Sequence, residues 1–182
     1  RRSSDLDAGF IALNAGVSGG ADVILIPEIP FKFESVMKKI QSRSGQGRKF
    51  SLIAVSEGAK PVGGMQVYSR KGDEVYVPRL GGIGQVVAEA IEQQGFESRV
   101  TVLGHVQRGG TPTAFDRWLA TRYGAAAVRL AASGRFDRMV ALQCGEITSL
   151  PLEEAVAVPK RVNPQGDAVV TARNIGISFG DE

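Results

Sequence analysis

The sequence has very little cysteine and no long apolar run. Cys144 is the single cysteine among 182 residues, so no internal disulfide is possible, which is typical of proteins from a reducing compartment. Cys144 stands in an apolar, strand-like run and is expected to be a small buried side chain. Because no stretch of about 18 consecutive apolar residues occurs, the sequence predicts no transmembrane helix. We therefore expect a cytoplasmic protein with no membrane partner.

An excess of charge of one sign is also lacking. The formal net charge is +3, and the pI of about 9.2 is mildly basic, which favours anionic small molecules as ligands. The basic residues form no concentrated stripe and are not accompanied by an aromatic-rich surface, so we expect no binding to nucleic acid. Glycine is abundant, with 23 residues, against a usual share of about 7%. Tight turns, or backbone lying close to a ligand, would account for this excess.

Strand-like and helix-like patterns alternate along the chain. Strands are expected at residues 23–26, 50–55, 99–103 and 139–143. Helices are expected near residues 10–17, 33–40, 83–91, 113–132 and 151–155. This alternation is typical of βαβ units and predicts an α/β fold in three layers, with a mostly parallel sheet flanked by helices.

The same patterns suggest how the chain is divided. Residues 1–7 are polar and are expected to be a disordered or foreign N-terminal segment. Residues 8–165 are expected to form one α/β domain. Past Pro164 the periodic pattern fades, so residues 166–182 are expected to be a C-terminal tail.

The most informative stretch begins at Arg99. An apolar run of four residues ends at Gly104, and His105, the only histidine, follows directly, with Arg108 and two glycines after it. A strand that ends in such residues and leads into a helix is where open α/β sheets bind ligands. Glycine lets the backbone approach a phosphate, while arginine and helix N-termini supply donors to it. Each feature alone is more often structural, and their combination favours an anion site.

Arg99 stands at the start of the same predicted strand. A strand of this length would separate it from His105 by about 20 Å, too far for one small ligand to contact both residues. Arg99 is therefore either structural or serves a ligand held by a neighbouring copy of the chain.

Residues 99–117 follow the pattern Arg-x4-Gly-His-x-Gln-Arg-Gly-Gly-x5-Asp-Arg, which resembles the signature of the 6-phosphofructokinases. The similarity extends over roughly residues 8 to 165 and includes segments 8–13, 20–28 and 54–59. The resemblance implies the Rossmann-like half of the phosphofructokinase fold. It also implies binding of fructose 6-phosphate and, in glycolysis, transfer of a phosphoryl group to it from ATP or pyrophosphate, giving fructose 1,6-bisphosphate.

The resemblance also implies roles for particular residues. Glu57, at the end of a predicted strand, and His105 and Arg108 would be sugar-phosphate ligands. Since the carboxyl ends of parallel strands lie along one edge of a sheet, these residues could face one cleft. Arg99 would reach across a subunit contact in a homo-oligomer, which agrees with the distance argument.

Three further residues match positions that line a nucleotide effector site in bacterial members of the family. They are Glu28, Arg48 and Lys49. Without the resemblance, charged surface residues would be the simpler interpretation of all three.

Several elements of the family are missing from this sequence. The glycine-rich donor loop, the Gly-Gly-Asp element and the loop carrying the catalytic Asp have no counterpart, and Ser4-Asp5-Leu6 replaces a Met-Gly-Arg element. We therefore expect no catalytic residue and no metal ligand here. Mg²⁺ and ATP (or pyrophosphate) would be bound mainly by the chain's own N-terminal half, without which this half is expected to be inactive. The alternative is a non-catalytic anion-binding or regulatory module.

Overall fold

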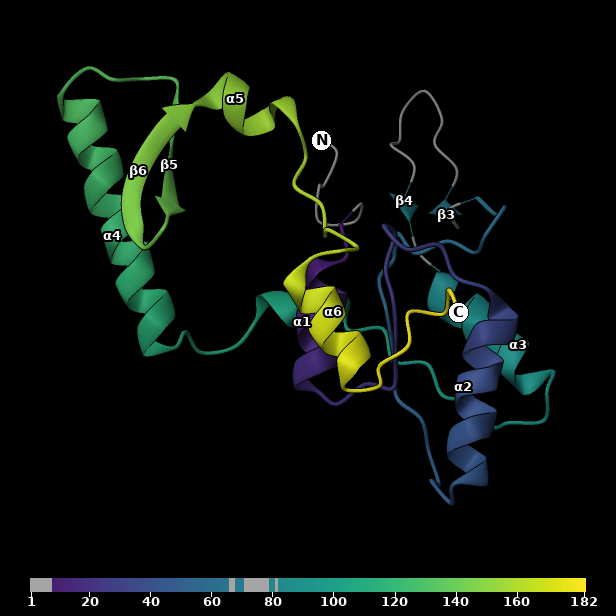
Figure 1. Cartoon of the computed structure of the whole chain (residues 1–182). Coiled ribbons are helices and arrows are strands. Elements are labelled where there is room, and N and C mark those ends of the chain that lie inside the picture. The colour runs from purple at the N-terminus through teal and green to yellow at the C-terminus, as the bar shows by residue number, and fades with distance from the viewer. Residues whose placement is uncertain (1–7, 66–67, 71–78, 81) are drawn as a thin grey trace. The chain divides into compact units, whose positions relative to one another are not determined.

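The computed structural model of the chain describes residues 8–65, 68–70, 79–80 and 82–182 (Figure 1). The chain divides into two compact units. The first unit consists of Arg1–Val102 and Lys160–Glu182, and the second of Leu103–Pro159. Residues 8–165, which were expected to form one domain, are thus divided between the two units. The segment expected to be foreign, residues 1–7, lies outside the described residues.

A parallel pair of strands forms the centre of the first unit. β1 (Val23–Leu25) pairs with β2 (Ile53–Val55), and Ser178 adds a parallel bridge on the other side of β1. All three residues of β1 are buried, as expected for a β-branched run covered on both faces. Both strands were predicted from the sequence, and both are shorter than predicted.

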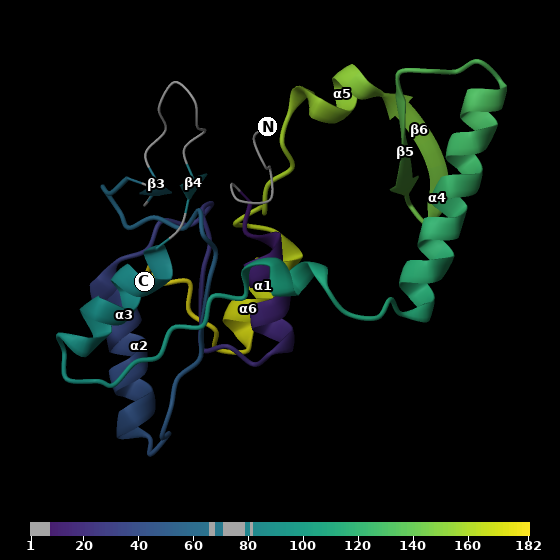
Figure 2. The ribbon, with the colours of Figure 1, turned by 180° about the vertical axis from the view of Figure 1, so that it is seen from behind.

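Helices cover both faces of this parallel pair. They are α1 (Phe10–Ser18), α2 (Phe33–Gly45), α3 (Ile83–Glu92) and α6 (Asp167–Asn174). Figures 1 and 2 show α1 beside α6 and α2 beside α3. Ile24 of β1 belongs to the apolar cluster that contains residues of α1 and α6, whereas Val23 and Leu25 belong to the cluster that contains residues of α2 and α3. Because side chains alternate along a strand, β1 supplies both clusters, and the predicted α/β fold in three layers is confirmed.

The C-terminal segment is part of this core. Residues 166–182 were expected to be a tail, and this expectation is wrong. α6 lies within the segment, the side chain of Phe179 is fully buried, and the backbone N–H of Ile24 donates to the Ser178 carbonyl at 2.9 Å. The sequence pattern gave too little signal because the helix has only eight residues and the segment is buried by distant parts of the chain.

The strand predicted over residues 99–103 does not form. These residues have no regular secondary structure, and the side chains of Val100, Val102 and Leu103 are 42%, 76% and 50% exposed. A strand is stable only when its backbone groups find a partner in a ladder. In the described part of the chain, none of the paired strands includes this segment.

The first unit also contains the short antiparallel pair β3 (Tyr68–Arg70) and β4 (Arg79–Leu80).

The second unit consists of helices and one β-hairpin. The 3₁₀-helix η1 (Gly104–Arg108) is followed by α4 (Ala114–Ala132), the hairpin strands β5 (Arg138–Gln143) and β6 (Glu146–Pro151), and α5 (Leu152–Ala157). In Figures 1 and 2, α4 lies alongside the hairpin.

The hairpin corrects two expectations. β5 was expected in the parallel sheet but pairs antiparallel with β6, a strand that the sequence analysis missed. Cys144 and Gly145 form the turn with φ angles of 50° and 87°, and two such residues are typical of a two-residue hairpin turn. Cys144, expected to be buried, is exposed at this turn.

Candidate functional site

Glu57 lies in the turn that follows β2. The backbone N–H of Ser56 donates to the Leu25 carbonyl at 2.9 Å and extends the parallel pairing, and the N–H of Ala59 then closes a turn on the Ser56 carbonyl at 2.9 Å. Ala59 is fully buried and anchors the turn. The side chain of Glu57 is half-buried and forms no hydrogen bond or ion pair with the described residues. A carboxylate that has no partner among the described residues, at the carboxyl edge of the sheet, can accept hydrogen bonds from a polar ligand.

Glu28 follows β1 at the same edge of the sheet, and its carboxylate is already paired. Both carboxylate oxygens accept from the backbone N–H of Gly9, at 3.0 and 3.1 Å, and Oε1 also accepts from the N–H of Val162 at 2.9 Å. Gly9 is the N-cap residue of α1, where an anion is favourable. Glu28 thus links three segments of the first unit, and its effector role stays a prediction.

Arg99 lies in the first unit, in the segment without regular structure. Its guanidinium group contacts the carboxylate of Glu97 at 3.1 Å, and the two side chains are 89% and 79% exposed. An ion pair this exposed contributes little to stability. The guanidinium group can therefore leave Glu97 for an anionic ligand at small cost.

His105 and Arg108 both belong to η1 in the second unit. The backbone N–H of Val106 donates to the Leu103 carbonyl at 3.0 Å, and the N–H of Gly109 donates to the Val106 carbonyl at 3.1 Å. A 3₁₀-helix has three residues per turn, so positions 105 and 108 stand one turn apart. The φ angle of 99° at Gly110 then turns the chain before α4, a conformation that glycine adopts without strain.

The predicted ligands are divided between the two units. Glu57 and Arg99 belong to the first unit, and His105 and Arg108 to the second. The boundary falls between Val102 and Leu103, inside the motif. The meeting of Glu57 with His105 and Arg108 in one site stays a prediction.

The remaining two effector candidates are on the surface. Arg48 and Lys49 are exposed in the loop between α2 and β2. The backbone N–H of Arg48 donates to the Arg43 carbonyl at 3.1 Å, and Arg43 also contacts the carboxylate of Asp22 at 2.8 Å. These contacts fix the start of the loop, and the two cationic side chains are available to solvent.

A capping box begins α4, at the end of the motif. The backbone N–H of Thr113 donates to Asp116 Oδ2 at 2.8 Å, and the Thr113 hydroxyl accepts from the Asp116 N–H at 3.2 Å. The hydrogen bonds from Thr113, first from its hydroxyl and then from its backbone, lower the pKa of the Asp116 carboxyl. The sequence analysis did not assign this role, although a Thr followed three residues later by an acidic residue signals it.

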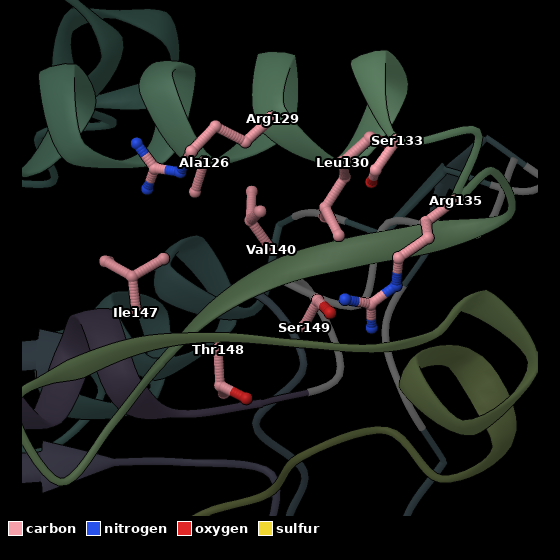
Figure 3. A pocket seen from close by; sticks show the side chains of 9 residues that line it. All are labelled: Ala126, Arg129, Leu130, Ser133, Arg135, Val140, Ile147, Thr148 and Ser149. Atoms are coloured by element: carbon pink, nitrogen blue, oxygen red, sulfur yellow. The ribbon is translucent and has the colours of Figure 1, made fainter.

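An open hollow of about 400 Å³ lies between α4 and the hairpin (Figure 3). Leu130, Val140 and Ile147 line it with apolar atoms, and the side chains of Arg129 and Arg135 also contribute to its wall. None of the predicted ligands lines this hollow, and the sequence analysis did not foresee it. It marks a place where α4 covers the hairpin incompletely.

No group of three or more His, Cys, Asp or Glu side chains gathers anywhere in the described ranges. Among these residues, no helix combines the length and the apolar character needed to cross a bilayer.

The sequence is similar to those of known kinases over nearly all of its length. The profile of the family described as Phosphofructokinase matches residues 6–131. ATP-dependent 6-phosphofructokinase from Chloroflexus aggregans is 54% identical over 175 residues, which cover 96% of this chain and 48% of that protein. ATP-dependent 6-phosphofructokinase 1 from Synechocystis is 49% identical over 177 residues, covering 97% and 48%. The chain thus spans about half the length of these relatives.

The chain is also similar to solved structures of phosphofructokinases. Phosphofructokinase from Saccharomyces cerevisiae superposes with a TM-score of 0.69 at 30% identity, covering 96% of this chain and 21% of that chain. A pyrophosphate-dependent phosphofructokinase from Nitrosospira multiformis gives a TM-score of 0.69 at 21% identity, covering 94% and 45%. This second match supports the fold alone.

Proposed function

The chain belongs to the phosphofructokinase family, and from this premise we propose that it is the fructose 6-phosphate-binding portion of an ATP-dependent 6-phosphofructokinase. The observation that carries the proposal is the family match over residues 6–131, which includes both Glu57 and the motif from Arg99 to Arg117. ATP is favoured over pyrophosphate as the donor because the relatives that are 44–54% identical are named ATP-dependent. The pyrophosphate-dependent structures are 21–22% identical.

The proposed sugar-phosphate-binding residues have different roles, which follow from their chemistry. Arg108 and His105 bind the phosphate of the sugar, since guanidinium and imidazole N–H groups form charge-assisted hydrogen bonds to phosphate oxygens. Glu57 accepts hydrogen bonds from sugar hydroxyls through its carboxylate, which has no partner among the described residues. Arg99 serves the site of a neighbouring subunit, which requires a homo-oligomer.

In this proposal the phosphoryl donor binds outside the segment that this chain represents. The sequence carries no counterpart of the family's donor loop or of the loop with the catalytic Asp. We place Mg²⁺, ATP and the catalytic base in the half of the relatives that this chain does not match. This chain then binds and orients fructose 6-phosphate and is inactive alone.

Calorimetric titration with fructose 6-phosphate tests the proposal. We expect saturable binding that Arg108→Ala weakens at least about tenfold, because a hydrogen bond to a charged group contributes roughly 1.5 to 3 kcal/mol. His105→Ala should weaken binding as well. Arg129→Ala, in the same unit but with no proposed role, is the matched control and should bind as tightly as the unaltered chain. Absence of binding by a folded chain would favour the non-catalytic module.

A further inference from the structure

The C-terminal end of the chain packs against the segment that leads into α2. Figures 1 and 2 show this end, in yellow, running from α6 toward α2. The N–H of Lys32 donates to the Gly180 carbonyl at 2.6 Å. A Cβ atom at Gly180 would lie 2.9 Å from the Cβ of Phe31 and 3.1 Å from Cδ2 of Leu25. Phe31 and Leu25 are both fully buried. Because the backbone of Gly180 fills this space, the end of the chain helps to fix the position of Phe31.

Arg173, in α6, contacts both neighbours of Gly180. Its guanidinium group donates two hydrogen bonds to the carboxylate of Asp181, at 2.6 and 3.1 Å. It also stands over the ring of Phe179, with 5.0 Å between Cζ and the ring centroid. A third hydrogen bond, to the more exposed Glu182, measures 2.7 Å. A bidentate pair of this kind is stronger and better oriented than a single-point contact, so Arg173 fixes the chain on either side of Gly180.

Phe31 also contacts the segment that follows Glu57. Its N–H donates to the Lys60 carbonyl at 3.1 Å, and its carbonyl accepts from the N–H of Val62 at 2.7 Å. Pro61, between these two residues, forms a parallel bridge with Phe31. One fully buried residue is therefore in contact with both the C-terminal end and the segment after the turn of Glu57.

The position of the Glu57 carboxylate depends on the backbone of its turn. The side chain is half-buried and forms no hydrogen bond or ion pair with the described residues. Before the turn, the N–H of Ser56 donates to the Leu25 carbonyl, and after it residues 60–62 are bonded to Phe31. A displacement of about 1 Å is enough to weaken contacts to a bound substrate severely. Both anchors must therefore be in place for the carboxylate to meet the hydroxyls of a sugar.

We propose that Arg173 is a positioning residue for sugar recognition. By fixing the C-terminal end against Phe31, it keeps the Glu57 carboxylate where it accepts hydrogen bonds from the hydroxyls of the sugar phosphate. Arg173 acts through these residues and does not contact the sugar. This inference rests on the proposed function, and it makes binding of the hexose depend on the last residues of the chain.

A double-mutant cycle tests whether Arg173 acts through Glu57. In calorimetric titrations of the 182-residue chain with fructose 6-phosphate, Arg173→Ala should raise the dissociation constant at least about fivefold. Glu57→Ala should raise it as well, because the hydroxyl contacts are lost. If Arg173 serves to place this carboxylate, the double variant should bind as tightly as Glu57→Ala alone, within about twofold. Additive losses would overturn the positioning role.

Arg43→Ala is the matched control for the loss of an ion pair. Arg43 contacts Asp22 at 2.8 Å, and its side chain is 22% exposed, against 27% for Arg173. Asp22 precedes β1 and Glu57 follows β2, so in this parallel pair they lie at opposite edges. Arg43→Ala should leave fructose 6-phosphate binding within about twofold. Losses equal to those of Arg173→Ala would overturn the inference.

Circular dichroism verifies that each variant is folded under the conditions of the titration. Asp181→Asn is a milder change to the same ion pair, and it takes the place of Arg173→Ala if that chain does not fold. Arg173→Lys keeps the charge but loses the planar two-point contact, and it should recover part of the affinity.

Hydrogen exchange measures the same displacement without a ligand. The N–H of Lys32 reports the contact with the C-terminal end, and that of Val62 reports the segment after Glu57. Arg173→Ala should raise the exchange rate of both at least about tenfold, whereas Arg43→Ala should leave both within about twofold. Unchanged protection at Val62 would overturn the link between the C-terminal end and the turn of Glu57.

Failure of the proposed function is distinguishable from failure of this inference. If the unaltered chain is folded but binds no fructose 6-phosphate, the proposed function is contradicted, and exchange at Val62 still decides whether Arg173 fixes the segment after Glu57. If the unaltered chain binds the sugar phosphate and Arg173→Ala binds it equally well, the positioning role is overturned and the proposed function stands.

Discussion

Glu28 accepts a hydrogen bond from the backbone N–H of Val162 at 2.9 Å, although 134 positions separate the two residues in the sequence. The same carboxylate accepts from the N–H of Gly9. One side chain thus ties the start of α1 and the returning C-terminal segment to the end of β1. At this edge of the parallel pair, the Glu28 carboxylate therefore stabilises the fold of the first unit.

Removing this carboxylate should weaken the first unit. Glu28→Ala leaves two partly buried N–H groups without an acceptor, and we expect the free energy of unfolding to fall by roughly 2 kcal/mol or more. Urea unfolding followed by circular dichroism measures the loss, and hydrogen exchange at Val162 locates it. Glu34→Ala removes an exposed carboxylate from α2 and serves as the control, with a change within about 0.5 kcal/mol. Equal effects of the two substitutions would show that the three contacts of Glu28 contribute nothing.

Gly9 should not tolerate a side chain. A Cβ atom at this position would lie 2.4 Å from the Cβ of Ile26 and 2.9 Å from Oε2 of Glu28. Because the backbone there is closely packed, Gly9→Ala should destabilise the first unit by roughly 1 to 3 kcal/mol. A Cβ at Gly45, at the end of α2, would meet nothing within 4 Å, so Gly45→Ala should stabilise by about 0.5 to 1 kcal/mol. Thermal unfolding of the two variants should therefore shift in opposite directions.

Asp116 should titrate below its ordinary pKa of 3.8, because Thr113 donates hydrogen bonds to the ionised carboxylate. The folded-state pKa is the lower one, so the capping box stabilises α4 fully above pH 3.8 and loses its effect as the pH falls through the lowered value. An NMR titration of the carboxyl group measures this shift. Thr113→Val removes the hydroxyl donor and should raise the pKa part of the way back. A value unchanged by the substitution would contradict the hydrogen-bond assignment.

The turn of the hairpin can be improved by one substitution. Cys144 adopts a φ of 50°, a region that asparagine enters more readily than most residues. Cys144→Asn creates the Asn-Gly sequence favoured in such turns and should stabilise the second unit by about 0.5 kcal/mol. Cys144→Val, with a β-branched side chain at the same φ, should destabilise it. Since Trp118 is the only tryptophan and lies in this unit, its fluorescence can follow both transitions.

Much of the fold could be predicted without the structure. The apolar run of β1, the amphipathic pattern of α2 and the glycines that precede α3 are local signals, and each element formed where it was expected. The motif around His105 and the position of Glu57 after β2 were also visible, because a motif and a strand end are read from neighbouring residues. The family followed from those residues, and the comparisons confirm it.

Other features depended on contacts between distant parts of the chain. Phe179 is buried because the C-terminal segment returns to β1, and Glu28 is paired because Gly9 and Val162 meet at that edge. The run from Val100 to Leu103 has every local property of a strand but remains unpaired within the described residues, since a strand also needs a neighbour. Periodicity and turn residues are encoded within a few positions of one another. Whether a side chain is buried, a strand is paired or a carboxylate is hydrogen-bonded depends on contacts between segments that are far apart in the sequence.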